Sequence, residues 1–161
     1  MSGKTIVVDY GIGNVYSVCN ALKRIGGEPD LTGDLAAIRS ADRLILPGVG
    51  AFARAMEALH AKGLSDAVKD FVATGRPFLG ICIGMQVLMD KSAEFGDYEG
   101  LGLVPGKVER IPHEGRAGNH LRIPHIGWVD LHKSGDASDS WLGKALAENA
   151  ANPGAVYFVH S

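Results

Sequence analysis

The 161-residue sequence has few cysteines, no long apolar run and almost no net charge. Two cysteines, Cys19 and Cys82, are too few for a disulfide framework, and we expect both to be reduced, as in the cytosol. No apolar stretch approaches the roughly 18 residues of a membrane span, and no signal-peptide core precedes the first strand-like residues. A net charge of −2 excludes a global basic field for nucleic acid or anionic membranes. These absences predict a cytoplasmic protein without nucleic-acid or membrane partners.

Common nucleotide-binding and metal-binding patterns are missing as well. Gly11 and Gly13 follow an apolar run, but the dinucleotide fingerprint needs a third glycine where Tyr16 stands. No phosphate-binding loop of the Gly-x-x-x-x-Gly-Lys-Ser/Thr type occurs. The six histidines show no pairing at metal-ligand spacing. The residues therefore indicate neither a nucleotide site nor a metal site.

The sequence does contain short apolar runs that alternate with amphipathic stretches. We expect strands over 5–9, 28–32, 43–46 and 77–81, and helices over 15–25, 35–40, 52–59, 64–72 and 84–91. This order predicts a flavodoxin-like α/β fold, a mostly parallel sheet with helices on both faces. After Gly100 we expect extended chain over 101–111, strands over 126–131 and 155–159 (the latter buried), and a helix over 141–148. With no repeat or linker, residues 1–161 are predicted to form a single domain.

The most informative stretch is a cysteine between two glycines at the end of an apolar run. Gly80 and Gly84 stand two residues before and after Cys82, the spacing that a sharp strand-to-helix turn requires. The residue at the apex of such a turn is pushed out of the sheet at a helix N-terminus, which favours the thiolate form of cysteine. The pattern predicts Cys82 as a nucleophile. The alternative is a small buried cysteine on an apolar strand.

A second glycine pair follows the apolar run 43–46. Gly48 and Gly50 flank Val49 at the carboxyl end of a strand, where backbone N–H groups can turn towards a neighbouring site. Such donors stabilise the oxyanion of a tetrahedral intermediate. The loop predicts an oxyanion hole built from Val49, Gly50 and the residue after the cysteine, Ile83. The alternative is an ordinary turn between a strand and a helix.

Five motifs in order along the chain resemble the class I, thiol-dependent glutamine amidotransferases. Besides the two glycine motifs, they lie at 9–14, 124–128 and 157–161. Together they are similar to the glutaminase subunit of imidazole glycerol phosphate synthase, over residues 5–161. The resemblance implies hydrolysis of L-glutamine to glutamate and ammonia without a metal or organic cofactor. It also implies a partner, the (β/α)8-barrel cyclase subunit that forms imidazole glycerol phosphate in histidine biosynthesis.

The resemblance further implies roles for individual residues. It assigns catalysis to Cys82 and contact with the partner to Asn14 and Trp128. It assigns glutamine binding to Gly48, Gln86, Glu94, His160 and Ser161. From the residues alone, other interpretations stay open: a helix N-cap for Asn14, a solvent-facing side chain for Gln86, a surface acid for Glu94 and a core aromatic for Trp128. His125 is more readily a half-buried structural histidine than a catalytic one.

The family's late His-Pro-Glu motif, which supplies the general base, has no counterpart up to Ser161. The resemblance therefore implies a chain without the last elements of the family fold, and little glutamine turnover by this chain alone. Two other interpretations remain open at this point. One is the glutaminase subunit of a different synthase, such as those of pyridoxal phosphate synthesis or chorismate-using enzymes. The other is a non-catalytic, degenerate glutaminase fold that acts as a binding subunit.

Overall fold

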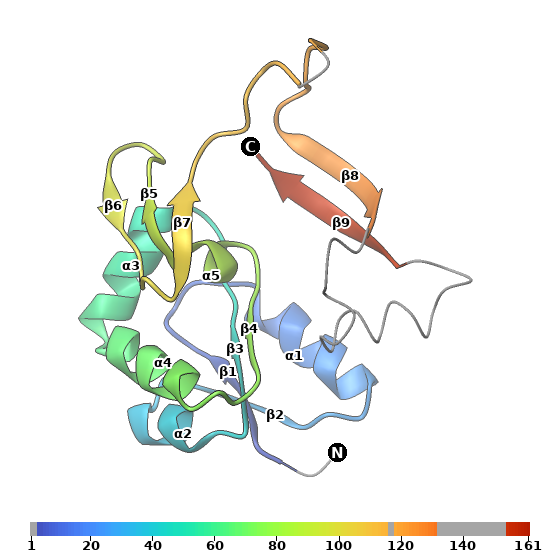
Figure 1. The fold of residues 1–161 in the computed structure, drawn as a ribbon. Coiled ribbons are helices and arrows are strands. Elements are labelled where there is room, and N and C mark those ends of the chain that lie inside the picture. Colours follow the sequence, from blue (N-terminus) through green and yellow to red (C-terminus); the bar gives the residue numbers. More distant parts are fainter. Residues whose placement is uncertain (1–2, 116–117, 132–153) are drawn as a thin grey trace. The chain divides into compact units, whose positions relative to one another are not determined.

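The computed structural model describes residues 3–115, 118–131 and 154–161. The chain divides into two compact units, Met1–Glu109 and Arg110–Ser161, and each is described by itself (Figure 1). The helix predicted over 141–148 lies outside the described residues. The single domain remains a prediction.

A four-stranded parallel sheet forms the centre of the first unit. In the order β2-β1-β3-β4, its strands are β2 (Pro29–Thr32), β1 (Thr5–Val8), β3 (Arg43–Leu46) and β4 (Phe78–Gly80). The register places Ile6 opposite Leu44, and Leu44 opposite Phe78. Because parallel strands end at the same edge of a sheet, the loops that follow β1, β3 and β4 meet at that edge.

Helices pack against both faces of this sheet, as Figure 1 shows. They are α1 (Val15–Arg24), α2 (Leu35–Ser40), α3 (Phe52–Ala61) and α4 (Leu64–Ala73). Val7 packs with α1, whereas Ile6 and Val8 pack with the other three helices. This alternation follows from the two-residue period of a strand. The predicted parallel α/β fold with helices on both faces is confirmed. None of the described helices is long and apolar enough to span a membrane.

The helix predicted over 84–91 is wrong. Helix α5 (Ile83–Gln86) ends after one turn, and β5 (Met89–Ser92) follows it. The reason is a competing backbone pairing, because the N–H groups of Leu101 and Leu103 donate to the carbonyls of Val87 and Leu88, each at 2.8 Å. Tertiary pairing of this kind overrides local helix propensity. Strand β5 joins β6 (Tyr98–Glu99) and β7 (Val104–Val108), in the order β6-β5-β7, and β7 lies within the extended chain predicted over 101–111.

The second unit contains an antiparallel pair, β8 (His125–Asp130) and β9 (Ala155–His160). Trp128 lies opposite Tyr157, and their rings meet edge to face with centroids 5.5 Å apart. We expected a buried strand over 155–159, and this is wrong: Tyr157 is 52% exposed and Val159 is 59% exposed. Each of the two strands has one strand neighbour among the described residues of this unit, so the outer edge of each strand is unpaired within it.

Candidate active site

Cys82 stands at the turn between β4 and α5. Its backbone angles, φ 56° and ψ −120°, lie in a region that residues with a side chain rarely adopt. Cys82 is exposed, whereas Cys19 is buried in α1. The alternative of a small buried strand cysteine at position 82 is therefore wrong. A strained, exposed apex suits a nucleophile, and that role stays a prediction.

The two glycines around Cys82 are required by the close approach of backbone segments. A methyl group added at Gly80 would lie 2.7 Å from the Gly84 carbonyl oxygen. One added at Gly84 would overlap the carbonyl oxygen of Leu46, the last residue of β3. Glycine at both positions therefore lets α5 lie directly against the carboxyl end of β3, next to the loop that follows it.

The loop after β3 has a packed half and an open half. A methyl group added at Gly48 would lie 2.6 Å from the Gly84 nitrogen and 2.9 Å from the Ile83 Cβ, so the loop begins against the Cys82 turn. Val49 is 47% exposed, and Gly50, at φ 88°, has open space around it. Among the described residues, none accepts a hydrogen bond from the N–H of Val49, Gly50 or Ile83. These three groups are thus free donors, as an oxyanion hole requires.

The Glu94 carboxylate is hydrogen-bonded to the start of α3, the helix that follows this loop. Its Oε2 accepts a hydrogen bond from the N–H of Phe52, the first residue of α3, at 2.8 Å. A carboxylate at this position satisfies one of the N–H groups that have no partner within the helix. Glu94 is half-buried and more than a surface acid. Its predicted contact with substrate remains a prediction.

Gln86 and Asn14 lie at the ends of helices. The Gln86 N–H donates to the Cys82 carbonyl at 3.1 Å, so Gln86 follows Cys82 by one helical turn, as the spacing predicts. Asn14 is the N-cap of α1, and its Oδ1 accepts a hydrogen bond from the Ser17 N–H at 3.2 Å. The capping interpretation of Asn14 is confirmed. Its contact with a partner remains a prediction.

Tyr10 belongs to the site, and the sequence analysis gave it no role. It follows β1, is 1% exposed, and donates a hydrogen bond from its hydroxyl to the Pro47 carbonyl at 2.7 Å. Burial raises the pKa of Tyr10 to about 12, and the neighbouring charge of Cys82 contributes to the rise. Tyr10 is therefore a hydrogen-bond donor at neutral pH and not a general base. Its position at the carboxyl edge of the sheet was the one signal that pointed to it.

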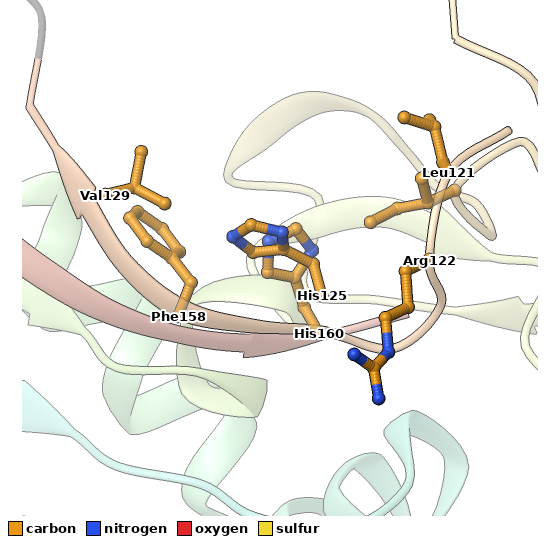
Figure 2. A pocket seen from close by; sticks show the side chains of 7 residues that line it. Leu121, Arg122, His125, Val129, Phe158 and His160 are labelled. Carbon is orange, nitrogen blue, oxygen red and sulfur yellow. The ribbon is translucent and has the colours of Figure 1, made fainter. Parts of the chain in front are cut away.

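The remaining predicted residues lie in the second unit. His160 and Ser161 are exposed at the end of β9, and Trp128 on β8 is 72% exposed, so Trp128 is not a core residue of this unit. Figure 2 shows the rings of His125 and His160 side by side in a cavity of about 390 Å³, with ring centroids 5.3 Å apart. His125 is exposed, which differs from the half-buried histidine we expected. The roles of His160, Ser161 and Trp128 stay predictions.

The described part of the chain holds no group of three or more His, Cys, Asp or Glu side chains placed to bind a metal ion.

Comparisons with known proteins identify the fold and the family of this chain. The CobB/CobQ-like glutamine amidotransferase domain family matches residues 15–119. A solved structure of a glutamine amidotransferase shares the fold, with a TM-score of 0.63 and 22% identity over 96% of this chain and 69% of that chain. The fold and the family match define a glutamine amidotransferase domain.

Two relatives narrow the family further. The chain is 44% identical to the imidazole glycerol phosphate synthase subunit HisH 1 of Legionella pneumophila (strain Lens), over 96% of this chain and 72% of that protein. It is also 44% identical to subunit HisH of Geobacillus thermodenitrificans (strain NG80-2), over 96% of this chain and 69% of that protein. The chain therefore belongs to the HisH family of imidazole glycerol phosphate synthase subunits. The resemblance inferred from the five motifs is confirmed.

Proposed function

We propose that this protein hydrolyses L-glutamine to glutamate and ammonia, and passes the ammonia to a cyclase subunit that forms imidazole glycerol phosphate in histidine biosynthesis. The observation that carries the proposal is Cys82, exposed at a strained turn beside a loop with free N–H donors. Membership of the HisH family supports the pairing with a synthase. We place the protein in the cytoplasm, and its two unpaired cysteines support this location.

The proposed reaction begins with attack of the Cys82 thiolate on the carboxamide carbon of glutamine. A carbon–sulfur bond forms, and the carbonyl electron pair moves to oxygen, where N–H groups of Val49, Gly50 and Ile83 bind the oxyanion. The oxyanion electron pair then re-forms the carbonyl while the carbon–nitrogen bond breaks, and the nitrogen takes up a proton from solvent water and leaves as ammonia. Water then hydrolyses the thioester, which releases glutamate and restores the thiolate. One oxyanion donor contributes roughly 2.7–4 kcal/mol to such a step.

Substrate recognition in this proposal uses the residues around Cys82. Gly48 lets the loop lie directly against the Cys82 turn, because any side chain there would collide with the backbone of α5, and its own backbone would contact the bound glutamine. Gln86 offers an amide that both donates and accepts hydrogen bonds. Glu94 uses Oε2 for the Phe52 N–H, so its Oε1 would hold the substrate ammonium. The family resemblance assigns contacts with glutamine to His160 and Ser161 as well.

The partner would dock on Asn14 and Trp128, both of which are exposed. Ammonia reacts only as uncharged NH₃, so a direct path to the cyclase avoids its protonation in water. The open half of the oxyanion loop fits such coupling. Gly50 adopts a conformation that glycine tolerates, and no hydrogen bond from the described part of the chain holds the Val49 peptide. Contact with the partner would turn this peptide inward, so that glutamine is consumed only in the complex.

Glutamate release by the full-length gene product, with and without the cyclase subunit, tests this function. We expect strong activation by the cyclase, loss of activity in Cys82→Ala, and retained activity in the matched control Cys19→Ala. Binding of the cyclase without any glutamate release would instead identify a non-catalytic subunit. Activity that survives in Cys82→Ala would exclude the proposed nucleophile.

A further inference from the structure

The loop that follows β1 holds Pro47 from two sides. The Tyr10 hydroxyl donates to the Pro47 carbonyl at 2.7 Å, between residues 37 positions apart. On the other side, a methyl group added at Gly13 would lie 3.4 Å from the Pro47 ring carbons Cβ and Cγ. The start of the oxyanion loop is therefore fixed against a neighbouring loop, whereas Val49 and Gly50 are exposed.

The hydrogen bond to Pro47 also constrains the donors that follow. The Pro47 carbonyl and the Gly48 N–H belong to one planar peptide unit, so fixing the carbonyl oxygen fixes the direction of that N–H. It also fixes the plane from which the Val49 peptide continues. Gly48 is packed here as well, because a methyl group added to it would lie 2.8 Å from the Tyr10 hydroxyl oxygen. The Tyr10 hydroxyl thus contacts the loop where its packed half begins.

We propose that Tyr10 is a positioning residue for the oxyanion loop: its hydroxyl holds the Pro47–Gly48 peptide so that the donors at Val49 and Gly50 face the oxygen of a substrate bound to Cys82. This inference rests on the proposed glutaminase function. Tyr10 acts through the loop and does not touch the reacting atoms. It remains protonated throughout the neutral range, so the hydroxyl is a permanent donor.

Two electrophiles separate an effect on the loop from an effect on the thiol. With a chloromethyl ketone analogue of glutamine, the Cys82 thiolate displaces chloride while the ketone oxygen takes the place of the carboxamide oxygen. With iodoacetamide, the thiolate displaces iodide and no glutamine side chain is placed in the pocket. Second-order rate constants for both reagents are measured on the complex with the cyclase subunit, in which the Val49 peptide is proposed to face inward, for wild type, Tyr10→Phe and Tyr16→Phe. Tyr16 is the matched control, because it is 79% exposed on α1.

We expect Tyr10→Phe to slow the ketone reaction by about 10-fold to 100-fold, because a misplacement of about 1 Å can cost about 100-fold. The iodoacetamide reaction stays unchanged, and Tyr16→Phe changes neither rate. Hydrogen exchange serves as the control for the fold: in Tyr10→Phe, the exchange rates of the strands and helices should stay at their wild-type values.

Three results overturn the inference in distinguishable ways. An unchanged ketone rate in Tyr10→Phe shows that the loop does not need this hydroxyl. Equal slowing of both reagents, or faster exchange throughout the chain, shows that Tyr10 supports the thiol or the fold as a whole. A wild-type protein that glutamine does not protect from the ketone contradicts the proposed function itself, and the role of Tyr10 falls with it.

Discussion

Replacing Cys82 by glycine and by alanine separates the backbone strain of the turn from its chemistry. At φ 56° and ψ −120°, a residue with a Cβ costs about 1–3 kcal/mol. Alanine keeps that cost, whereas glycine removes it. Glycine gains freedom in the unfolded chain, which offsets about 0.4–1 kcal/mol of the benefit. We therefore expect the free energy of unfolding to be about 1 kcal/mol higher for Cys82→Gly than for Cys82→Ala.

Urea unfolding followed by circular dichroism measures this difference. For a chain of this size, about 1 kcal/mol also corresponds to about 2–4 °C in Tm. Asn20, exposed in the middle of α1, provides the control pair. There glycine should be less stable than alanine by about 0.8–1.0 kcal/mol, the opposite sign. If Cys82→Gly is no more stable than Cys82→Ala, the strained turn on which the site is built does not exist in solution.

Three further predictions follow from other contacts. Gly84→Ala should destabilise the fold by about 3 kcal/mol, since its methyl group meets the β3 backbone, whereas Gly127→Ala, with open space around it, should be nearly neutral in urea unfolding. Glu94→Gln should raise the KM for glutamine more than it lowers kcat in a glutamate-release assay, because the amide oxygen still accepts from the Phe52 N–H; equal kcat and KM in variant and wild type would exclude the substrate contact. The pKa of Tyr10 is raised to about 12 in the fold, so its contribution to stability is complete below its usual pKa near 10 and is lost as the pH rises towards 12. The urea midpoint of the wild type should therefore fall across this pH range, and Tyr10→Phe should lack this part of the fall.

The sequence predicted the parts of this structure that depend on local pattern. The short apolar runs and the glycines at 80 and 84 are local signals, and they identified the sheet and the turn at Cys82. The helix predicted over 84–91 failed because the carbonyls of Val87 and Leu88 pair with a segment more than ten residues away. Propensity within the run contains no information about that pairing.

The role of Tyr10 was missed for a related reason. Its hydrogen bond joins two loops that are 37 residues apart in the chain and meet only at the carboxyl edge of the sheet. The exposure of β9 was likewise not readable from its apolar composition, because burial depends on what packs against a strand. Sequence patterns predicted the proposed nucleophile and donors, whereas the proposed positioning role of Tyr10 could be inferred only from the fold.

The most direct test of the central claim is to map the cysteine that reacts with a glutamine analogue. The chain is incubated with the glutamine analogue whose side-chain carboxamide is replaced by a chloromethyl ketone, digested, and analysed by mass spectrometry, with glutamine or asparagine as competitor. We predict modification of Cys82, protection by glutamine and not by asparagine, and no modification of Cys19, which is buried. Modification mainly at Cys19, or modification of Cys82 that glutamine does not slow, would contradict the account.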